Sequence, residues 1–409
     1  MAGPLKGYRV LDMSRILAGP WAGQLLADLG ADVVKIERPG CGDDTRHWGP
    51  PYLKDQDGNE TEDAAYFFCA NRGKKSVTID ITRSEGQDII RQLALQSDVL
   101  IENYKVGGLA KYGLDYSALK KINPKLIYCS ITGFGQTGPY ANRPGYDFLI
   151  QGMGGLMSIT GEPDSPDNKT AGPVKVGVAV TDLFTGLYAA NAIQGALLER
   201  HQSGVGQYID LALLDVQAAV LANQASNYLI GNLVPERLGN AHPNIVPYQA
   251  FATADSHIII AVGNDQQFAR FCKVIKSPLM AEDPLYASNA NRVNNRQVLC
   301  ESISVSLRQK DSRHWLAAFE ANDVPCGPIN SIDQVFKDPQ IIAREMLINV
   351  SDSRSGSLKM VGNPIKYSRT RIEYPASPPQ LGEQTHDVLQ DYLEYSECQL
   401  TELQAKGII

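Results

Sequence analysis

Short apolar runs and amphipathic stretches alternate along the first third of the chain. Apolar residues dominate 8–13 and 33–36, and the segment between them, 20–31, reads as a helix with proline at its start and glycine near its end. Strand, helix and strand in this order predict two parallel strands joined by a helix. The same rhythm predicts strands at 76–81, 99–103 and 126–133 and a helix at 88–98. We therefore expect an α/β fold with a parallel sheet wrapped by helices.

The pattern changes after a long apolar helix, which we expect near 183–200. A strand and a second helix follow, and then a loop at 235–251 that is rich in Gly, Pro and Asn. A short strand at 257–263 and mixed helices up to residue 320 come next. The remaining expectations are a unit at 325–372 that closes in a strand at VGNPIKYS, two short tail helices, and a polar surface loop at 54–63.

Composition narrows the class of protein without naming an activity. The chain has 409 residues, of which 43% are hydrophobic and 20% charged, which is typical of a globular protein with two or three domains. A net charge of −7 argues against electrostatic binding of nucleic acid, although a local basic patch could still bind a phosphorylated small molecule. The 6 histidines have no metal-ligand spacing, so nothing calls for a metal site.

The cysteines and the N-terminus bear on the compartment. The 7 cysteines are scattered, odd in number and without a C-x-x-C pair, which favours a reducing environment. The segment before the first strand has neither a basic-then-apolar signal nor an Arg/Ser-rich leader. We expect a cytoplasmic protein, or one of the mitochondrial matrix if this is a mature eukaryotic chain.

The first strand–helix–strand unit raises the possibility of a dinucleotide site. Glu37 ends the second strand, where a ribose-binding acid would stand. The turn RILAGPWAG is not G-x-G-x-x-G, however, and its Pro20 does not suit a close approach of a pyrophosphate. The turn therefore disfavours NAD or FAD, whereas another nucleotide-bearing ligand stays open.

Basic residues gather near the ends of the expected strands. For most of them the ordinary interpretation is a solvated surface, but a subset would suit several phosphates, since the guanidinium fork matches phosphate oxygens. These residues are Arg15, Arg38, Arg46, Arg72, Lys74, Lys75, Lys111 and Arg143.

A single carboxylate interrupts the apolar run VGVAVTDLFTGLYAA. Asp182 is the only charged residue between Val176 and Leu198. A buried, unpaired carboxylate is costly, so something must satisfy it or use it. Three interpretations stay open: an N-cap of the following helix together with Thr181, a buried ion pair with a distant base, or a nucleophile aimed from a helix start. On the residues alone, capping is the better interpretation.

The loop LGNAHPN at 238–244 has two interpretations. A lone histidine in such a loop, here His242, is usually structural. Alternatively, the loop is a mobile lid whose N–H groups shelter an oxyanion.

Several long motifs in order carry a family resemblance. They include PLKGYRVLDMSRILAGPWAGQLLADLGADVVKIERPGCGDDTR, NRGKKSVTIDI, VLIENYKVGGLAKYGLDY, PKLIYCSITGFGQTGPYANRPGYD and VAVTDLFTGLYAANAIQGALLERHQSGVGQYIDLALLD, followed by VPCGPI, VGNPIKYS and the LGEQT tail. The sequence resembles the class III (CaiB/BaiF-type) coenzyme A-transferases over nearly its whole length. Stretches such as GDDTRHWGPPY, NYLIG and IVPYQAF are most similar to the branch that acts on succinyl-CoA and glutarate.

The resemblance implies an architecture that spacing does not reveal. It implies a large Rossmann-like, CoA-binding domain built from 1–205 with 325–409, a smaller α+β domain at 225–324, and a connecting segment at 206–224. It also implies an interlocked homodimer. The CoA thioester would be a substrate, and no prosthetic group, nucleic acid or membrane is implied.

The resemblance also carries over individual residues. Asp182 matches the catalytic aspartate. Lys111 replaces an arginine and keeps its charge, and Leu17 stands where the formyl-CoA transferase has glutamine, which argues against oxalate. Residues 239, 240 and 242 stand near the family's glycine loop, here Gly239, Asn240 and His242. The positions that match CoA contacts are Ile16, Leu17, Ala18, Arg38, Ile79, Asn103, Tyr104, Lys111, Arg143 and Tyr146.

The implied reaction moves CoA from an acyl-CoA, expected to be succinyl-CoA, to a dicarboxylic acid, expected to be glutarate, through an aspartyl anhydride and an aspartyl-CoA thioester. Alternatives are a transferase for carnitine or oxalate, a racemase or epimerase of CoA esters, a CoA-ester binding protein without turnover, and a nicotinamide oxidoreductase. Tyr146 stands where the racemases have histidine, and a tyrosine is a poor base near neutral pH. For the distal carboxylate of the acid, Arg237 or His242 are the candidate partners.

Overall fold

The computed structural model describes residues 3–164 and 172–409 and divides into two compact units. Unit 1 comprises Met1–Leu156, Val176–Ala225 and Pro339–Ile409, and unit 2 comprises Met157–Lys175 and Ser226–Asp338. Unit 1 is thus assembled from both ends of the chain. Each unit is described below by itself.

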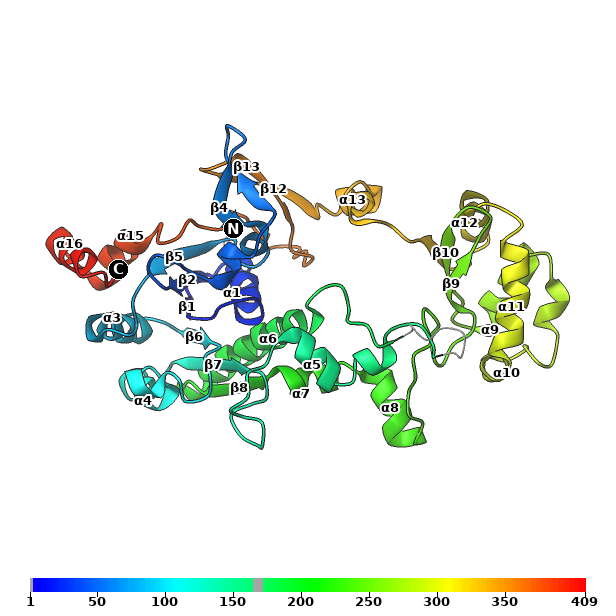
Figure 1. The fold of residues 1–409 in the computed structure, drawn as a ribbon, viewed down its shortest axis with the longest axis horizontal. Coiled ribbons are helices and arrows are strands. Elements are labelled where there is room, and N and C mark those ends of the chain that lie inside the picture. The colour runs from blue at the N-terminus through cyan, green and yellow to red at the C-terminus, as the bar shows by residue number, and fades with distance from the viewer. Residues whose placement is uncertain (1–2, 165–171) are drawn as a thin grey trace. The chain divides into compact units, whose positions relative to one another are not determined.

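Unit 1 is built on a parallel sheet of six strands (Figure 1). The strand order is β5-β2-β1-β6-β7-β8, and every neighbouring pair is parallel. This is the doubly wound order in which the first strand lies at the centre and the chain reverses direction beside it. The strands are β1 (Arg9–Asp12), β2 (Asp32–Glu37), β5 (Lys74–Thr78), β6 (Val99–Glu102), β7 (Ile127–Thr132) and β8 (Tyr208–Ala212). The predicted parallel α/β sheet is confirmed.

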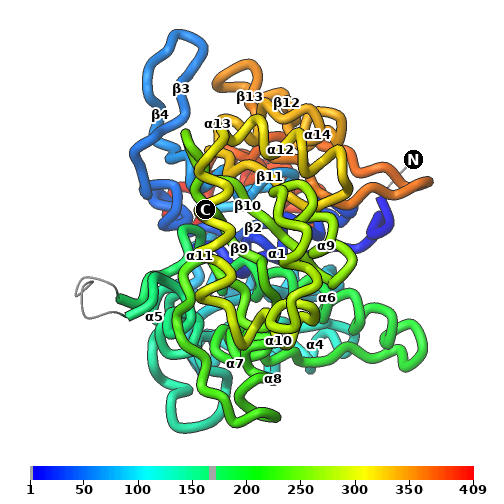
Figure 2. The backbone as a smooth tube through the Cα atoms, turned by 90° about the vertical axis from the view of Figure 1, so that its right-hand side faces the viewer, coloured from blue at the N-terminus to red at the C-terminus, as the bar shows by residue number. Residues whose placement is uncertain are grey.

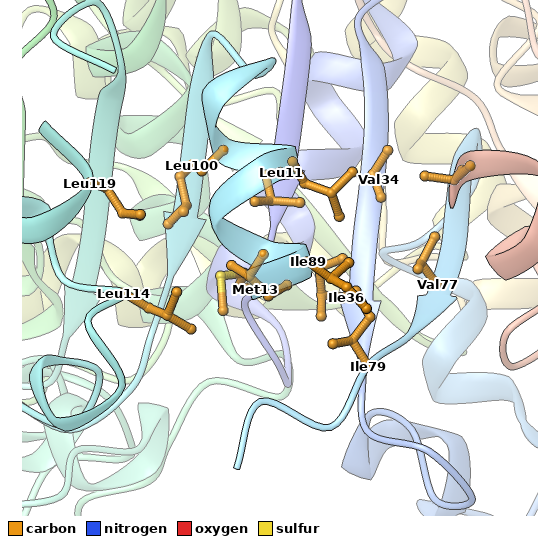
Figure 3. Close-up of a cluster of buried hydrophobic side chains, with 14 of the residues drawn as sticks. Leu11, Met13, Val34, Ile36, Val77, Ile79, Ile89, Leu100, Leu114 and Leu119 are labelled. Carbon is orange, nitrogen blue, oxygen red and sulfur yellow. The ribbon is translucent and has the colours of Figure 1, made fainter. Parts of the chain in front are cut away.

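Consecutive residues of each strand point to opposite faces of the sheet and pack into two separate hydrophobic cores. Leu11, Val34 and Leu100 pack under α3 (Ser84–Leu95), as Figure 3 shows for part of this cluster. The same face takes up α4 (Tyr116–Ile122) and the tail helices α15 (Thr385–Leu393) and α16 (Glu397–Ala405). The opposite face packs against α1 (Ala18–Asp28) and α6 (Val180–Ser203). A parallel sheet must be covered on both faces, and the tail completes that cover.

Two hairpins stand at the margin of unit 1, side by side in Figure 2. One is β3 (Tyr52–Lys54) with β4 (Glu60–Ala64), and the other is β12 (Leu347–Asp352) with β13 (Gly356–Val361). The predicted loop at 54–63 is therefore confirmed only for 55–59, because Lys54 and residues 60–63 belong to the two strands. Its polar residues form a hairpin because the Asp55 carboxylate accepts the N–H groups of Asp57 and Asn59 and closes the turn.

The predicted strand at VGNPIKYS is also wrong. β13 ends at Val361, the N–H of Gly362 still donates to the carbonyl of Met346, and the pairing stops after it. The N–H of Asn363 donates to the hydroxyl of Tyr374, and the following proline has no N–H to offer a neighbouring strand.

Shorter elements complete unit 1. They are the turns η1 (Asp44–His47) and η2 (Ala110–Tyr112), and the helices α2 (Ala65–Phe68), α5 (Asp147–Met153), α7 (Leu213–Ala219) and α14 (Pro339–Ala343). Residues 206–224, expected as a connecting segment, include β8 and α7. Because β8 pairs with β7 at the sheet edge, this segment is part of unit 1.

Unit 2 has its own core around a three-stranded antiparallel sheet of order β11-β10-β9. The strands are β9 (Tyr248–Ala252), β10 (His257–Ala261) and β11 (Cys326–Pro328). β11 comes from VPCGPI, which places residues up to Asp338 in unit 2. Its helices and turns are η3 (Met157–Ile159), α9 (Asp265–Val274), η4 (Pro278–Ala281), α10 (Asn289–Asn294), α11 (Arg296–Leu307), α12 (Ser312–Glu320) and α13 (Ile332–Val335). α8 (Ala222–Gly231) runs from unit 1 into unit 2.

Two further observations concern the whole described chain. All seven cysteines are free. None of the helices in residues 3–164 and 172–409 is long and apolar enough to cross a membrane.

Candidate active site

A cavity of about 760 Å³ opens in unit 1 at the carboxyl ends of the parallel strands. In sheets of this type, ligands bind in the crevice outside these strand ends, and the volume is that of a ligand pocket. Segments that follow β1, β2, β5, β6 and β7 supply most of its wall. The cavity brings together Asp182 with all ten residues expected to contact CoA: Ile16, Leu17, Ala18, Arg38, Ile79, Asn103, Tyr104, Lys111, Arg143 and Tyr146.

Asp182 lies in the first turn of α6 and does not cap it. The helix begins at Val180, so Asp182 is its third residue, and its N-cap, Ala179, makes no side-chain cap bond. The capping prediction is wrong because another acid does this work. Oδ1 of Asp147, at the start of α5, accepts the N–H groups of Thr181 at 2.8 Å and Asp182 at 3.3 Å. The Asp182 carboxylate is thereby left free for chemistry.

A buried polar layer holds Asp147 in this capping position. Nε2 of Gln151 donates to Asp147 Oδ2 at 2.7 Å, and Oε1 of Gln151 accepts the N–H of Val176 at 2.9 Å. Oγ1 of Thr181 donates to Oε1 of the buried Gln217 at 2.6 Å. These bonds fix the start of α6 from two helices, α5 and α7, so the direction of Asp182 is set before any ligand binds.

A glycine allows α6 to approach α1 closely. A Cβ on Gly186 would lie 2.7 Å from the carbonyl oxygen of Ala18 and 2.9 Å from Cδ1 of Trp21, so no larger residue fits. Gly186 is one helical turn after Asp182. The close packing therefore brings the Asp182 turn to the N-terminal end of α1, where Leu17 and Ala18 line the same cavity.

The environment of Asp182 raises its pKa to about 7 from an ordinary value of 3.8. Burial is the larger cause, and the nearby charge of Asp147 adds to it. Within the described residues, Asp182 forms no ion pair, so the ion-pair interpretation does not hold. A half-buried carboxylate that is weakly solvated and ionises near neutral pH is a more reactive nucleophile than a solvated one.

Four basic side chains of the cavity wall have no carboxylate partner among the described residues: Arg38, Lys105, Lys111 and Arg143. Arg143 lies over the rings of Phe134 and Tyr140, and Lys111 lies over Tyr112. Ring contacts orient these cations without neutralising them. The wall therefore offers an anionic ligand four basic side chains that form no salt bridge in the described part of the chain, although the charge of Arg38 also acts on the nearby Asp80.

Most other basic residues of the predicted cluster form salt bridges away from the ligand cavity. The prediction of a solvated surface is wrong for Arg46, Arg72 and Lys74, which are nearly fully buried. Arg46 pairs with Glu37, Arg72 with Asp28, and Lys74 with Asp12. Lys75 pairs with Asp32 in a half-exposed contact, and Arg15 pairs with Asp44 at the rim of the cavity.

Glu37 is committed elsewhere, although it stands where a ribose-binding acid would. Its two oxygens accept from Arg46, from Oγ of Ser76 at 2.7 Å and from the N–H of Asp43 at 2.9 Å. Because these bonds occupy the carboxylate, Glu37 is not available to bind a ribose. The nicotinamide interpretation therefore loses its main support.

The expected substrate loop lies in unit 2, outside the residues that line the cavity. Nδ1 of His242 accepts the N–H of Asn244 at 3.1 Å, which leaves the proton of the neutral ring on Nε2. Burial and the nearby Arg296 lower the pKa of His242, so the ring is a neutral donor near pH 7. Arg237, the other candidate, donates to the carbonyl of Glu162 and pairs with Asp164.

Three features of the site escaped sequence reasoning. Lys105 follows Asn103 and Tyr104 directly, so its place after a strand end could have revealed it. The capping role of Asp147 depends on a contact across 35 residues and has no local signal. The buried pair of Lys35 and Asp43, which also lines the cavity, joins residues only 8 positions apart, but nothing in the sequence marks it as paired.

The arrangement suits group transfer from a large anionic ligand. A nucleophilic carboxylate and a cationic wall share one cavity. Leu17, Ala18 and Gly19, at the start of α1, have N–H groups with no acceptor among the described residues, and helix N-terminal N–H groups favour developing negative charge. In the described ranges no three His, Cys, Asp or Glu side chains gather to hold a metal ion.

Comparisons with known proteins agree on one family. The model of CoA-transferase family III matches residues 5–385. The succinate–glutarate CoA-transferase of Agrobacterium fabrum is 52% identical over 94% of this chain and 95% of its own. The succinyl-CoA:glutarate CoA-transferase of Mus musculus is 43% identical over 99% and 90%. The crystal structure of a CAIB/BAIF family protein from Brucella suis superposes with a TM-score of 0.83 at 48% identity, covering 96% of this chain and 100% of that one.

Proposed function

This chain belongs to CoA-transferase family III, and we propose that it transfers CoA from succinyl-CoA to glutarate. The observation that carries the proposal is the position of Asp182: a half-buried, unpaired carboxylate in the same cavity as four basic side chains that form no salt bridge within the described residues. The names of two relatives that match nearly the whole chain support this choice of acids.

The proposed chemistry exchanges one thioester for another. The Asp182 carboxylate attacks the succinyl thioester carbonyl, which forms a mixed anhydride and releases CoA thiolate. The thiolate attacks the aspartyl carbonyl, so succinate leaves and an aspartyl-CoA thioester remains. The glutarate carboxylate attacks this thioester, giving a glutaryl anhydride and thiolate again. The thiolate then attacks the glutaryl carbonyl, which gives glutaryl-CoA and regenerates Asp182. Each thioester or anhydride bond that breaks is replaced by another, so the reaction as written needs neither ATP nor a metal.

The cavity supplies what these steps need. The basic side chains Arg38, Lys105, Lys111 and Arg143 would hold the phosphates of CoA. The free N–H groups of Leu17 and Ala18 would stabilise the oxyanion at each attack. With the substrate bound, the apolar residues around Asp182 would limit the access of water, which would otherwise hydrolyse an anhydride.

The loop of Gly239, Asn240 and His242 would recognise the acid. A dicarboxylate has a second, unreacting carboxylate that needs a donor. Nε2–H of His242 is such a donor, since its other ring nitrogen is already occupied. Nε and Nη2 of Arg237, by contrast, are engaged within unit 2.

Self-association is part of the proposal, as an interlocked pair of identical chains. Large apolar side chains stand exposed on α6 and α8, including Leu198 at 69% and Ile230 at 85%. A monomer seldom exposes such side chains in groups, and a second copy of the chain would cover them. Sedimentation equilibrium tests this part directly: a dimer mass is expected, and a monomer would contradict it.

The central test replaces Asp182 by alanine. Asp182→Ala should abolish transfer from succinyl-CoA to glutarate and still bind CoA, because the cations of the wall remain. Glu199→Ala, which removes an exposed carboxylate at the other end of the same helix, is the matched control and should transfer normally. Transfer by Asp182→Ala near the wild-type rate would overturn the proposal. A panel of dicarboxylic acids, with acyl-CoA products identified by mass spectrometry, tests the choice of glutarate.

A further inference from the structure

The backbone at Ile16 is strained on the wall of the cavity. Ile16 has φ of 72°, in the left-handed region that a β-branched side chain rarely adopts. It directly precedes Leu17, the N-cap of α1, and both line the cavity. Strain of this kind persists only where the surroundings hold the backbone in place, and it is typical of functional sites.

The buried carboxylate of Asp43, which lines the same cavity, holds this backbone in place. Oδ1 of Asp43 accepts the N–H of Ile16 at 3.2 Å and also the N–H and Oγ1–H of Thr45, at 3.0 and 2.8 Å. Oδ2 of Asp43 accepts Nζ of Lys35 at 2.8 Å, and the same Nζ donates to the carbonyl of Ser14 at 2.9 Å. Lys35 and Asp43 together therefore fix backbone atoms on both sides of Arg15.

The remaining atoms of this turn are fixed as well. The side-chain amide of Asn103 accepts the N–H of Arg15 at 2.9 Å and donates to its carbonyl at 2.7 Å. The carboxylate of Asp12 accepts the N–H of Ser14 at 3.0 Å. Three consecutive residues, 14–16, are thus tied by side chains from four segments of unit 1. Together these bonds hold Ile16 in the left-handed conformation, although the strain of that conformation disfavours it.

Stability does not account for the Lys35–Asp43 pair. Both side chains are almost completely buried, with 0% and 1% of their surface exposed. Desolvation of two charges costs as much as their attraction returns, so apolar residues in their place are often neutral or better for stability. Burial alone would raise the pKa of Asp43, but the charge of Lys35 and the hydrogen bonds from Lys35 and Thr45 outweigh it and lower the pKa to about 2. The Lys35–Asp43 pair is therefore charged at any pH at which the enzyme works.

We propose that Asp43, held by Lys35, is a positioning residue that keeps Ile16 in the left-handed conformation and thereby presents the N–H groups of Leu17 and Ala18 to the reacting thioester. The proposal rests on the proposed transferase function for its kinetic readout. Asp43 acts through the backbone of Ile16 and does not itself touch the reacting atoms. A relaxed turn would let α1 start in another direction, so the oxyanion would lose these donors in the transition state.

The test is a double-mutant cycle between Asp43→Asn and Ile16→Gly. Asparagine at position 43 loses the charge that pairs with Lys35. Glycine at position 16 adopts a positive φ without strain, so its backbone does not depend on the bond to Asp43. With Ile16 in place, Asp43→Asn should lower kcat by about tenfold, which corresponds to about 1.4 kcal/mol, and change KM for succinyl-CoA by less than about threefold. In the Ile16→Gly background the same substitution should lower kcat by less than about threefold. An equal loss in both backgrounds would overturn the proposal.

A matched control separates positioning from stability. Asp28→Asn breaks another buried pair, with Arg72, that does not line this cavity. It should lower the melting temperature as Asp43→Asn does and leave kcat within about twofold at a temperature well below melting. An equal loss of kcat in both variants would make the effect merely structural and contradict the proposal. Thr45→Val removes one donor to Asp43 and leaves the ion pair, so it provides a milder version of the cycle if Asp43→Asn does not fold.

Hydrogen exchange makes the test independent of the transferase reaction. Peptides that cover residues 14–19 should exchange faster in Asp43→Asn than in wild type, and Asp28→Asn should leave them unchanged. Unchanged exchange in Asp43→Asn would overturn the positioning role even if transfer is normal. Wild-type protein that transfers no CoA between any acids, by contrast, would overturn the proposed function. The positioning role of Asp43 would then be decided by hydrogen exchange alone.

Discussion

Replacing Asp182 by asparagine should stabilise the folded protein, and the gain should grow as the pH rises. The pKa of Asp182 is about 7 in the folded chain against an ordinary value of 3.8, so the folded state keeps a proton that the unfolded state releases between these values. Stability must therefore fall as the pH rises through this window. Asparagine has nearly the same shape and no charge to desolvate, so it escapes this loss.

The size of the effect follows from the shift. A difference of about 3 pH units corresponds to about 4 kcal/mol at 1.36 kcal/mol per unit, which is an upper limit. Asp182 is half-buried at the wall of an open cavity, and water there reduces the cost of its charge, so we expect about 1–3 kcal/mol at pH 8 and almost none at pH 4. For a chain of 409 residues this corresponds to a rise in Tm of about 1–4 °C.

The assay is the difference in Tm between Asp182→Asn and wild type, measured by calorimetry from pH 4 to pH 8. The difference is needed because Glu102, whose pKa is also raised to about 7 by burial, contributes equally to both proteins. Glu199→Gln, which replaces an exposed carboxylate of the same helix by an amide, is the matched control for the substitution itself. A difference that stays flat for Asp182→Asn, or one in which the variant is the less stable protein at pH 8, would refute the reasoning.

Four further predictions concern activity. The rate of the first turnover with succinyl-CoA should rise with pH and reach half its maximum near pH 7, where Asp182 ionises; a stopped-flow profile that is flat from pH 5 to 9 would contradict this. Asp147→Asn should move that midpoint to lower pH, because it removes the second cause of the raised pKa, and should lower stability by about 1 kcal/mol through a weaker cap of α6; an unmoved midpoint would show that the two carboxylates do not interact. Arg143→Gln should raise KM for succinyl-CoA about tenfold and leave KM for glutarate unchanged, and added salt should weaken succinyl-CoA binding less in the variant than in wild type. The protein should not exchange the α-proton of a 2-methylacyl-CoA with deuterium, since Tyr146 is a poor base; exchange without an acceptor acid, seen by mass spectrometry, would instead support a racemase.

Local patterns were sufficient to predict the sheet. The strands at β1, β2, β6 and β7 are apolar runs in which consecutive residues enter opposite cores, and this burial on both faces is visible in the sequence itself. The hairpin at 54–63 was missed because its strands are polar and half-exposed, so hydrophobic periodicity carries no signal there. The apolar residues after Val361 alternate and so predict a strand, but from Asn363 on the N–H groups bond to side chains and not to a neighbouring strand.

The site was predictable only in part, for a related reason. The isolation of Asp182 in an apolar run marked it as unusual, but its state depends on Asp147, which lies 35 residues away. Arg46 and Arg143 look alike in the sequence. The first is buried against Glu37, whereas the second lines the cavity, and only long-range packing separates the two cases. Residue roles that depend on such partners cannot be read from composition or spacing.

The most direct test of the central claim is to identify the residue that carries the covalent intermediate. The protein is incubated with succinyl-CoA and hydroxylamine, without glutarate, and then digested and analysed by mass spectrometry. An activated aspartyl group reacts with hydroxylamine to give a hydroxamate, so the peptide that contains Asp182 should carry this modification, and only when succinyl-CoA is present. A hydroxamate on another residue, or an unmodified Asp182 in protein that is transferring CoA, would contradict the account.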